Sequence, residues 1–276
     1  MDQRYATCPE DIPGMTTADL RRRYLIEEVF TPDAVNLTYT HHDRIVLGGA
    51  LPVTGPLTLT PPPELRSADF FDHREAGLVN VGGTGRVTLG EDQYDLAHGA
   101  CLYIGRGAPN PVLTSQDAAN PAKFYLFSAP AHTAYPTVLT DPGQGNVREL
   151  GAPVTSNERT LNQYIVPDRV PSCQVMLGVT TLHPGNMWNT MPAHTHDRRT
   201  ECYLYFDLPA DARVIHLMGH PQETRHLVVG DCQAVISPSW GVHSGVGTAA
   251  YSFVWAMAGE NQDFDDMDGF PVTVMR

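Results

Sequence analysis

Short runs of β-forming residues separated by glycine turns recur along most of this chain. Between residues 78 and 104 the runs are LVNV, RVTL, QYDL and CLYI, and the first two flank the turn at residues 82–85. The second half repeats the pattern at residues 173–182, 202–206, 213–218, 227–229, 233–236 and 250–257. The 24 Gly and 23 Pro favour frequent turns over long helices. This spacing is typical of sandwiches and barrels, so we expect an all-β protein made of two similar β-barrels in tandem.

Two other segments organise the chain. The loop at residues 136–153 contains the turn-rich sequence DPGQGN, so we place a boundary there, between a first barrel of residues 1–150 and a second of residues 151–276. Near the N-terminus, Thr17 as N-cap and Asp19 in the first turn predict a short amphipathic helix that ends near Phe30.

Charge and cysteine content restrict the partners and the compartment. The net charge of −13 argues against nucleic acid and anionic membranes as partners, and no apolar run is long enough to span a bilayer. Five cysteines without CxxC spacing favour a reducing compartment, and the first residues lack the apolar stretch of a secretion signal. We therefore expect a cytoplasmic protein.

Three histidines and one glutamate form a candidate metal site. His194 and His196 would point to the same side of a strand, because side chains alternate between the two faces. Glu201 has the wrong parity for one unbroken strand, and a turn at residues 197–199 would restore it to that side. His243 follows a Pro/Gly turn further along the chain. Nitrogen and oxygen ligands without thiolate suit zinc, iron, manganese or nickel.

A His-x-His pair alone is weak evidence in a chain with 12 His. The alternative is that His194 and His196 are two half-exposed residues of a strand. The first half of the chain has no His-x-His with a matching Glu. If the two barrels are related, only the second is expected to hold metal.

A small β-barrel with His-x-His, then Glu, then a later His resembles a cupin, and two in tandem resemble a bicupin. The chain is most similar to the 5-keto-4-deoxyuronate isomerases, or 4-deoxy-L-threo-5-hexosulose-uronate ketol-isomerases, of pectin breakdown. The stretches that carry this resemblance span nearly the whole chain: DRI at 43–45, FY at 124–125, APAHT at 129–133, NMWNTMP at 186–192, HTHDRR at 194–199, Met218, PQETRH at 221–226, ISPSW at 236–240, HSGVG at 243–247 and GENQ at 259–262. Asp197 stands where the family usually has Glu, and the glycine of the general cupin motif is displaced to Gly185.

The resemblance implies zinc, one ion per subunit, bound by His194, His196, Glu201 and His243, with other divalent metals as alternatives. It also implies a cytoplasmic homo-oligomer, in this family often a hexamer. The implied reaction converts 5-dehydro-4-deoxy-D-glucuronate to 3-deoxy-D-glycero-2,5-hexodiulosonate. This is an aldose–ketose isomerisation through an enediolate, whose charge a divalent metal would stabilise.

Two further groups of residues are candidates for the chemistry. Glu223 and His226 could shuttle the proton, since carboxylate and imidazole are the usual shuttles. The alternative is a polar surface turn in which Glu223 pairs with Arg225. The substrate carboxylate suits a guanidinium, and the candidates are Arg198, Arg199, Arg225 and Arg159. For Arg198 and Arg199 the alternative is a solvated turn.

Three rival functions use the same ligand set. One is another bicupin isomerase, such as the 5-deoxy-glucuronate isomerase of inositol breakdown. The second is an iron-dependent cupin dioxygenase, and the third is a metal-stabilised sugar-binding or storage protein without turnover. Substrate assays, oxygen consumption and metal content would separate them.

Overall fold

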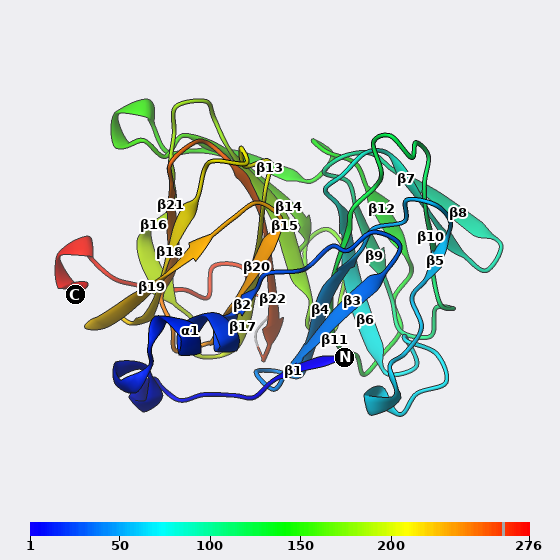
Figure 1. The fold of residues 1–276 in the computed structure, drawn as a ribbon, viewed down its shortest axis with the longest axis horizontal. Coiled ribbons are helices and arrows are strands. Elements are labelled where there is room, and N and C mark those ends of the chain that lie inside the picture. Colours follow the sequence, from blue (N-terminus) through cyan, green and yellow to red (C-terminus); the bar gives the residue numbers. More distant parts are fainter. Residues whose placement is uncertain (261–262) are drawn as a thin grey trace.

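The computed structural model describes residues 1–260 and 263–276. Asn261 and Gln262, part of the last stretch of the resemblance, lie outside the described residues. The described chain forms two units that lie side by side, each with two sheets (Figure 1). The expected all-β class with a short N-terminal helix is confirmed.

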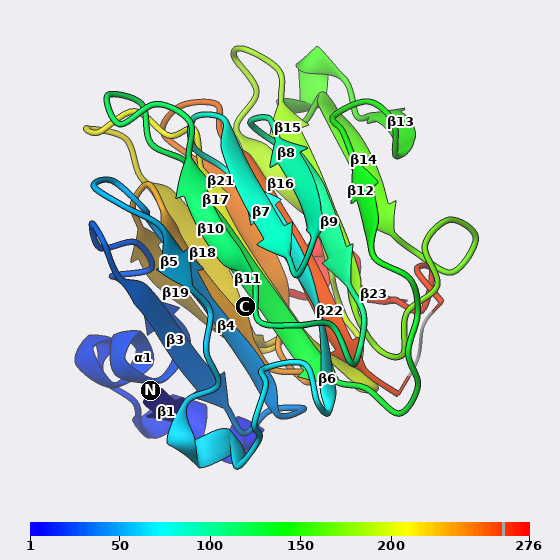
Figure 2. The same ribbon diagram turned by 90° about the vertical axis from the view of Figure 1, so that its right-hand side faces the viewer.

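The first unit consists of a seven-stranded and a four-stranded sheet. The seven-stranded sheet contains, in order, β1 (Asp2–Arg4), β3 (Val35–Thr40), β4 (Ile45–Ala50), β11 (Phe124–Pro130), β6 (Arg74–Asn80), β9 (Cys101–Ile104) and β12 (Val138–Thr140). The four-stranded sheet, in front in Figure 2, contains β5 (Leu57–Thr58), β10 (Val112–Ser115), β7 (Gly85–Leu89) and β8 (Asp92–Leu96).

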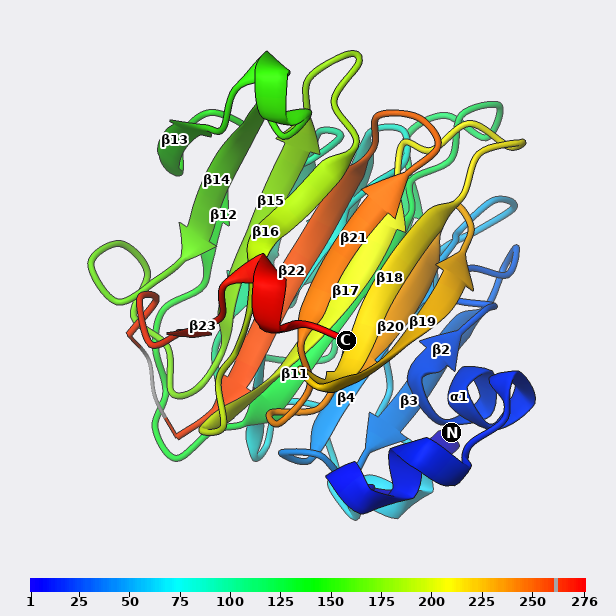
Figure 3. The same cartoon turned by 90° about the vertical axis from the view of Figure 1, so that its left-hand side faces the viewer.

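The second unit repeats this arrangement. Its seven-stranded sheet contains β13 (Asn146–Leu150), β14 (Arg159–Ile165), β15 (Met176–Leu182), β22 (Ser252–Gly259), β17 (Arg199–Phe206), β20 (Gln233–Ser237) and β2 (Leu25–Ile26). Its outer sheet, in front in Figure 3, contains β19 (Glu223–Val229), β18 (Val214–His220), β21 (His243–Gly247), β16 (Trp188–Thr195) and β23 (Asp268–Gly269). Short 3-10 helices lie at Pro9–Gly14, Pro63–Leu65, Pro153–Thr155 and Val272–Val274.

The two seven-stranded sheets pack against each other in the middle of the molecule (Figure 1). One hydrophobic cluster joins side chains of both, among them Leu47, Val79, Phe127, Leu177, Leu204 and Val254. One further cluster fills the interior of each unit. Strands β6 and β17 are interior strands of these sheets, and side chains pack on both of their faces. Both strands are therefore buried along their whole length.

The N-terminal helix is shorter than expected. Helix α1 (Thr17–Tyr24) is capped by Thr16 rather than Thr17, because the Thr16 hydroxyl accepts the Asp19 backbone N–H at 3.2 Å and the Asp19 carboxylate accepts that of Thr16 at 3.1 Å. The helix ends well before Phe30, because Leu25 and Ile26 leave it to pair with β20 as β2. Within the described residues, every helix is too short or too polar to cross a bilayer.

Strand pairing shows where the chain passes from the sheets of the first unit to those of the second. Strand β12 is the last of the first unit, and β13, which begins at Asn146, already pairs with β14 of the second. Strand β2, near the start of the chain, also belongs to the second unit. The passage from one unit to the other falls inside the expected loop at residues 136–153. The division into residues 1–150 and 151–276 stays a proposal.

Candidate metal centre

The two expected histidines lie where one strand ends and a turn begins. His194 belongs to β16, His196 follows it, and a turn at residues 197–198 leads into β17. Glu201 lies near the start of β17, so the turn returns it to the side of the histidines. His243 opens β21, and strand pairing sets it opposite His194.

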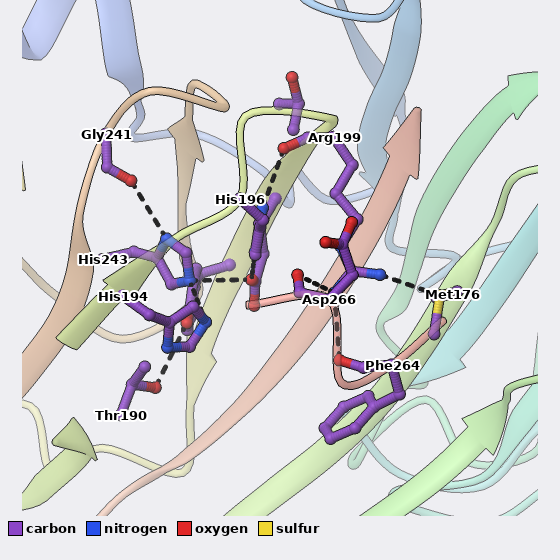
Figure 4. Close-up of polar contacts among 12 residues, drawn as sticks. Met176, Thr190, His194, His196, Arg199, Gly241, His243, Phe264 and Asp266 are labelled. Carbon is purple, nitrogen blue, oxygen red and sulfur yellow. Dashed lines mark hydrogen bonds and ion pairs between the residues drawn. The ribbon is translucent and has the colours of Figure 1, made fainter. Parts of the chain in front are cut away.

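The donor atoms of these four side chains converge, and Figure 4 shows the three histidines close together. All four lie within 4.8 Å of one another, and within the described residues they are the one group of this kind. His243 Nε2 lies 3.0 Å from His194 Nε2 and 3.1 Å from Glu201 Oε2, and His196 Nε2 lies 3.0 Å from the same oxygen. These separations would allow one ion to contact the donors at about 2.1 Å each.

Hydrogen bonds on the far side of two rings leave the inward nitrogens as acceptors. His196 Nδ1 lies 3.0 Å from the Arg199 carbonyl, and His243 Nδ1 lies 3.4 Å from that of Gly241. A carbonyl only accepts, so each Nδ1 donates to it, and a neutral ring of this tautomer would offer its Nε2 lone pair to a metal. A metal would then replace the contacts that these Nε2 atoms make with the Glu201 carboxylate. The donor set therefore fits a divalent metal.

Burial and neighbouring charges favour the protonation states that bind metal. Burial, together with nearby His243, lowers the pKa of His194 to about 2, which keeps this imidazole neutral. Burial alone would raise the pKa of Glu201, but His243 and His196 outweigh it and hold that pKa well below its usual value. Neutral imidazole and ionised carboxylate are the ligand forms.

His194 and Glu201 line a cavity of ≈ 340 Å³. Strand residues of the second unit form much of its wall, among them Arg159, Thr180, Tyr203, Phe253, Trp255 and Met257. Phe264, Asp265 and Met267, from the segment after β22, complete it. The volume lies in the range of small-molecule sites, so a compact ligand entering the cavity would reach the donor cluster.

Arg198 and Arg199, two expected substrate-binding residues, are bound to the protein's own groups in this structure, and their role toward a substrate stays a prediction. Arg198 forms ion pairs of 2.6 Å with Asp266 and 2.8 Å with Asp268, and it is not part of the cavity wall. Arg199 does line the cavity, but it is only 1% exposed. Its guanidinium donates to three backbone carbonyls, those of Asp263, Phe264 and Asp266.

Arg159 is the expected arginine that the structure does bring to the site. It lies at the start of β14 and lines the cavity. One of its nitrogens donates to the Asn157 carbonyl at 2.8 Å, and within the described residues no carboxylate pairs with it. Burial lowers its pKa, although a guanidinium remains charged at neutral pH.

Glu223, Arg225 and His226 lie on β19 and are not among the residues that line the cavity. Glu223 and His226 are exposed, and Glu223 pairs with Arg225 at 2.7 Å. The structure thus supports the alternative reading of this segment as a polar surface pair. The order of residues along the sequence could not show that β19 is an edge strand of its sheet.

Two contributors to the site were missed by sequence reasoning. The segment at residues 263–268 folds back onto the cavity, although nothing in its acidic sequence indicates where it packs. Asp43 of the first unit accepts hydrogen bonds from the backbone N–H of Thr200 at 2.9 Å and from its hydroxyl at 2.6 Å, directly beside Glu201. The stretch DRI carried the resemblance, but no role for Asp43 followed from it.

Comparisons with known proteins agree with the site and the fold. The model of the KduI/IolB family matches residues 25–269. A 4-deoxy-L-threo-5-hexosulose-uronate ketol-isomerase from Kineococcus radiotolerans is 64% identical over 279 residues, with 100% of both chains covered. Among solved structures, an IolB-like protein from Salmonella typhimurium has a TM-score of 0.67 at 17% identity, covering 82% of this chain and 87% of that one. Oxalate decarboxylase from Bacillus subtilis has a TM-score of 0.53 at 9% identity, covering 79% and 70%.

At these identities the two solved structures show the fold alone, and they confirm the expected tandem cupin architecture. The family match covers most of the chain, and the curated relative covers all of it. This chain therefore belongs to the KduI/IolB family.

Proposed function

We propose that this protein is a metal-dependent ketol-isomerase that converts 5-dehydro-4-deoxy-D-glucuronate to 3-deoxy-D-glycero-2,5-hexodiulosonate in pectin and uronate breakdown. The observation that carries the proposal is the convergence of His194, His196, Glu201 and His243 beside a cavity of small-molecule size. The 64% identity to a relative named for this activity supports the choice of reaction.

Zinc is the metal we propose for the four donors, because nitrogen and oxygen ligands without thiolate suit it and a bicupin isomerase of this kind is expected to use it. When bound, it would supply the Lewis acidity that stabilises negative charge on the two oxygens of an enediolate. The remaining groups of the cavity would bind and orient the sugar acid.

Arg159 is the residue we propose for the substrate carboxylate. It is partly buried in the cavity wall and lies on a rigid strand. A guanidinium in such a setting can donate two parallel hydrogen bonds to a carboxylate. Opposite ends of the sugar acid would then contact Arg159 and the donor cluster.

We further propose a cytoplasmic location and a homo-oligomer, with a hexamer as the family's frequent form. The net charge of −13 supports the absence of nucleic-acid and anionic-membrane partners. Light scattering of the purified protein measures the oligomer directly.

A second candidate is the 5-deoxy-glucuronate isomerase type, because such a bicupin isomerase would share the architecture, the donor set and an acidic sugar substrate. An iron-dependent cupin dioxygenase is the remaining enzymatic rival, since the same donors also suit iron.

The test follows 5-dehydro-4-deoxyglucuronate by proton NMR with purified protein, before and after chelation and after zinc is restored. Metal-dependent formation of the 2,5-diketo acid is the expected result. No conversion by a folded, metal-loaded protein would contradict the proposal. Turnover of 5-deoxy-glucuronate would then favour the second candidate, and oxygen consumption with bound iron would favour the dioxygenase.

A further inference from the structure

The segment at residues 263–268, called here the C-terminal strap, forms part of the cavity wall. Phe264, Asp265 and Met267 all line the cavity. The Phe264 ring packs on Trp255 of β22 with 5.3 Å between the ring centroids. Figure 4 shows Phe264 and Asp266 beside Arg199. The strap therefore positions its side chains next to the candidate metal centre.

Two adjacent arginines hold the strap in place. Arg199 donates to the carbonyls of Phe264 and Asp266 at 3.1 Å each, on either side of Asp265, and to that of Asp263. Arg198 pairs with Asp266 and Asp268. The backbone at Asp265 is thus fixed from both directions.

Asp265 differs from the other three acids of the strap. The Asp263 carboxylate accepts the backbone N–H of Asp265 at 3.0 Å, and the other two pair with Arg198. The Asp265 carboxylate has no hydrogen bond or ion pair to any described residue. It lies at the rim of the cavity, exposed to solvent, where a proton can be exchanged with water.

Few groups that line the cavity can carry a proton between two carbons. His194 and Glu201 belong to the metal-donor cluster. Tyr203 is buried, its hydroxyl lies 3.4 Å from that of Thr190, and a phenol keeps its proton near neutral pH and so is a poor base. Arg148, Arg159 and Arg199 are cations that cannot accept a proton. Among the described lining residues, Asp265 remains as the carboxylate that is not committed to another role.

We propose that Asp265 is the proton shuttle of the isomerisation, an inference that rests on the proposed function. Its carboxylate takes the proton from the hydroxyl-bearing carbon next to the aldehyde. The C–H electron pair becomes the carbon–carbon double bond of the enediolate, and the aldehyde oxygen takes the negative charge. Asp265 returns the proton to the former aldehyde carbon, while the hydroxyl proton moves to the neighbouring oxygen. No atom or electron is gained or lost.

The test compares Asp265→Asn and Asp265→Ala with the wild-type protein and with Asp211→Asn. The control also changes a carboxylate to an amide, at an exposed position outside the cavity. Three quantities are measured: kcat and KM by NMR, exchange of deuterium from D2O into the hydroxymethyl carbon of the 2,5-diketo acid, and zinc content. We expect Asp265→Asn to lower kcat and the exchange rate by roughly 10²–10⁴-fold, with KM and zinc content unchanged. Asp211→Asn should match the wild type within about twofold.

Formate in the buffer tests for a missing carboxylate, because it can enter the space left in Asp265→Ala. Partial recovery of exchange by formate is expected, and a strap that had only moved would not respond. Wild-type rates in Asp265→Asn would overturn the assignment of Asp265 while leaving the isomerase function intact. Failure of the wild-type protein to convert the substrate would overturn the function itself, and the inference with it.

Discussion

The contact between Asp43 and Thr200 predicts that the unit without the donor cluster affects metal binding. Asp43 lies in a left-handed turn with φ of 50° and accepts two hydrogen bonds from Thr200, whose neighbour in β17 is Glu201. In Asp43→Asn the charge is lost, and the amide can accept fewer bonds. Weakening these charge-assisted bonds costs about 1–2 kcal/mol, since Asp43 is partly exposed. If Thr200 transmits that loss to Glu201, zinc binding weakens by roughly tenfold, as for other outer-shell changes.

The assay is competition for zinc with a chromophoric chelator. Asp33→Asn is the matched control, because Asp33 also lies in a left-handed turn, with φ of 56°, and accepts hydrogen bonds from Val53 and Thr54 far from the donor cluster. Equal zinc affinity in wild type, Asp43→Asn and Asp33→Asn would refute the reasoning, and an equal loss in both variants would point to general destabilisation.

Three further results are expected. Arg159→Met should raise KM by roughly 10–100-fold with little change in zinc content, while Arg225→Met on β19 leaves KM unchanged, as steady-state kinetics can show. Glu75→Gln should lower the free energy of unfolding in urea by about 3 kcal/mol, because the buried carboxylate accepts from Tyr103 and three backbone N–H groups and an amide leaves some unpaired. The hydrogen bond to Asp207 raises the pKa of His98, so the stability from this pair is present below pH about 6.5 and is lost as pH rises through the folded pKa. Asp207→Asn should therefore destabilise more at pH 5.5 than at pH 8.5 in urea titrations.

The sequence predicted those parts of the site that depend on local patterns. We placed His194, His196 and Glu201 near His243 from three local patterns: alternation along a strand, a polar turn and a Pro/Gly turn. The donor distances confirm that these side chains lie together. Strand runs and glycine turns predicted the all-β class in the same way.

The remaining parts depend on which strands become neighbours. Glu223 and His226 have suitable side chains, but their strand lies at the edge of the outer sheet. Arg198 and Arg199 lie near the ligands along the chain, yet their guanidinium groups bind residues 263–268, more than sixty positions away. No local pattern in the sequence could reveal either pairing.

The pairing of β2 with β20 also has a consequence for biosynthesis. Leu25 lies opposite Val235, about 210 residues later in the chain. A ribosome that adds 5–20 residues per second needs roughly 10–40 seconds to make that stretch. During this time the N-terminal segment is without its strand partner. This edge of the second seven-stranded sheet therefore forms only after β20 has been made, and a deletion that removes Leu25 and Ile26 is expected to impair the unit that holds the donor cluster.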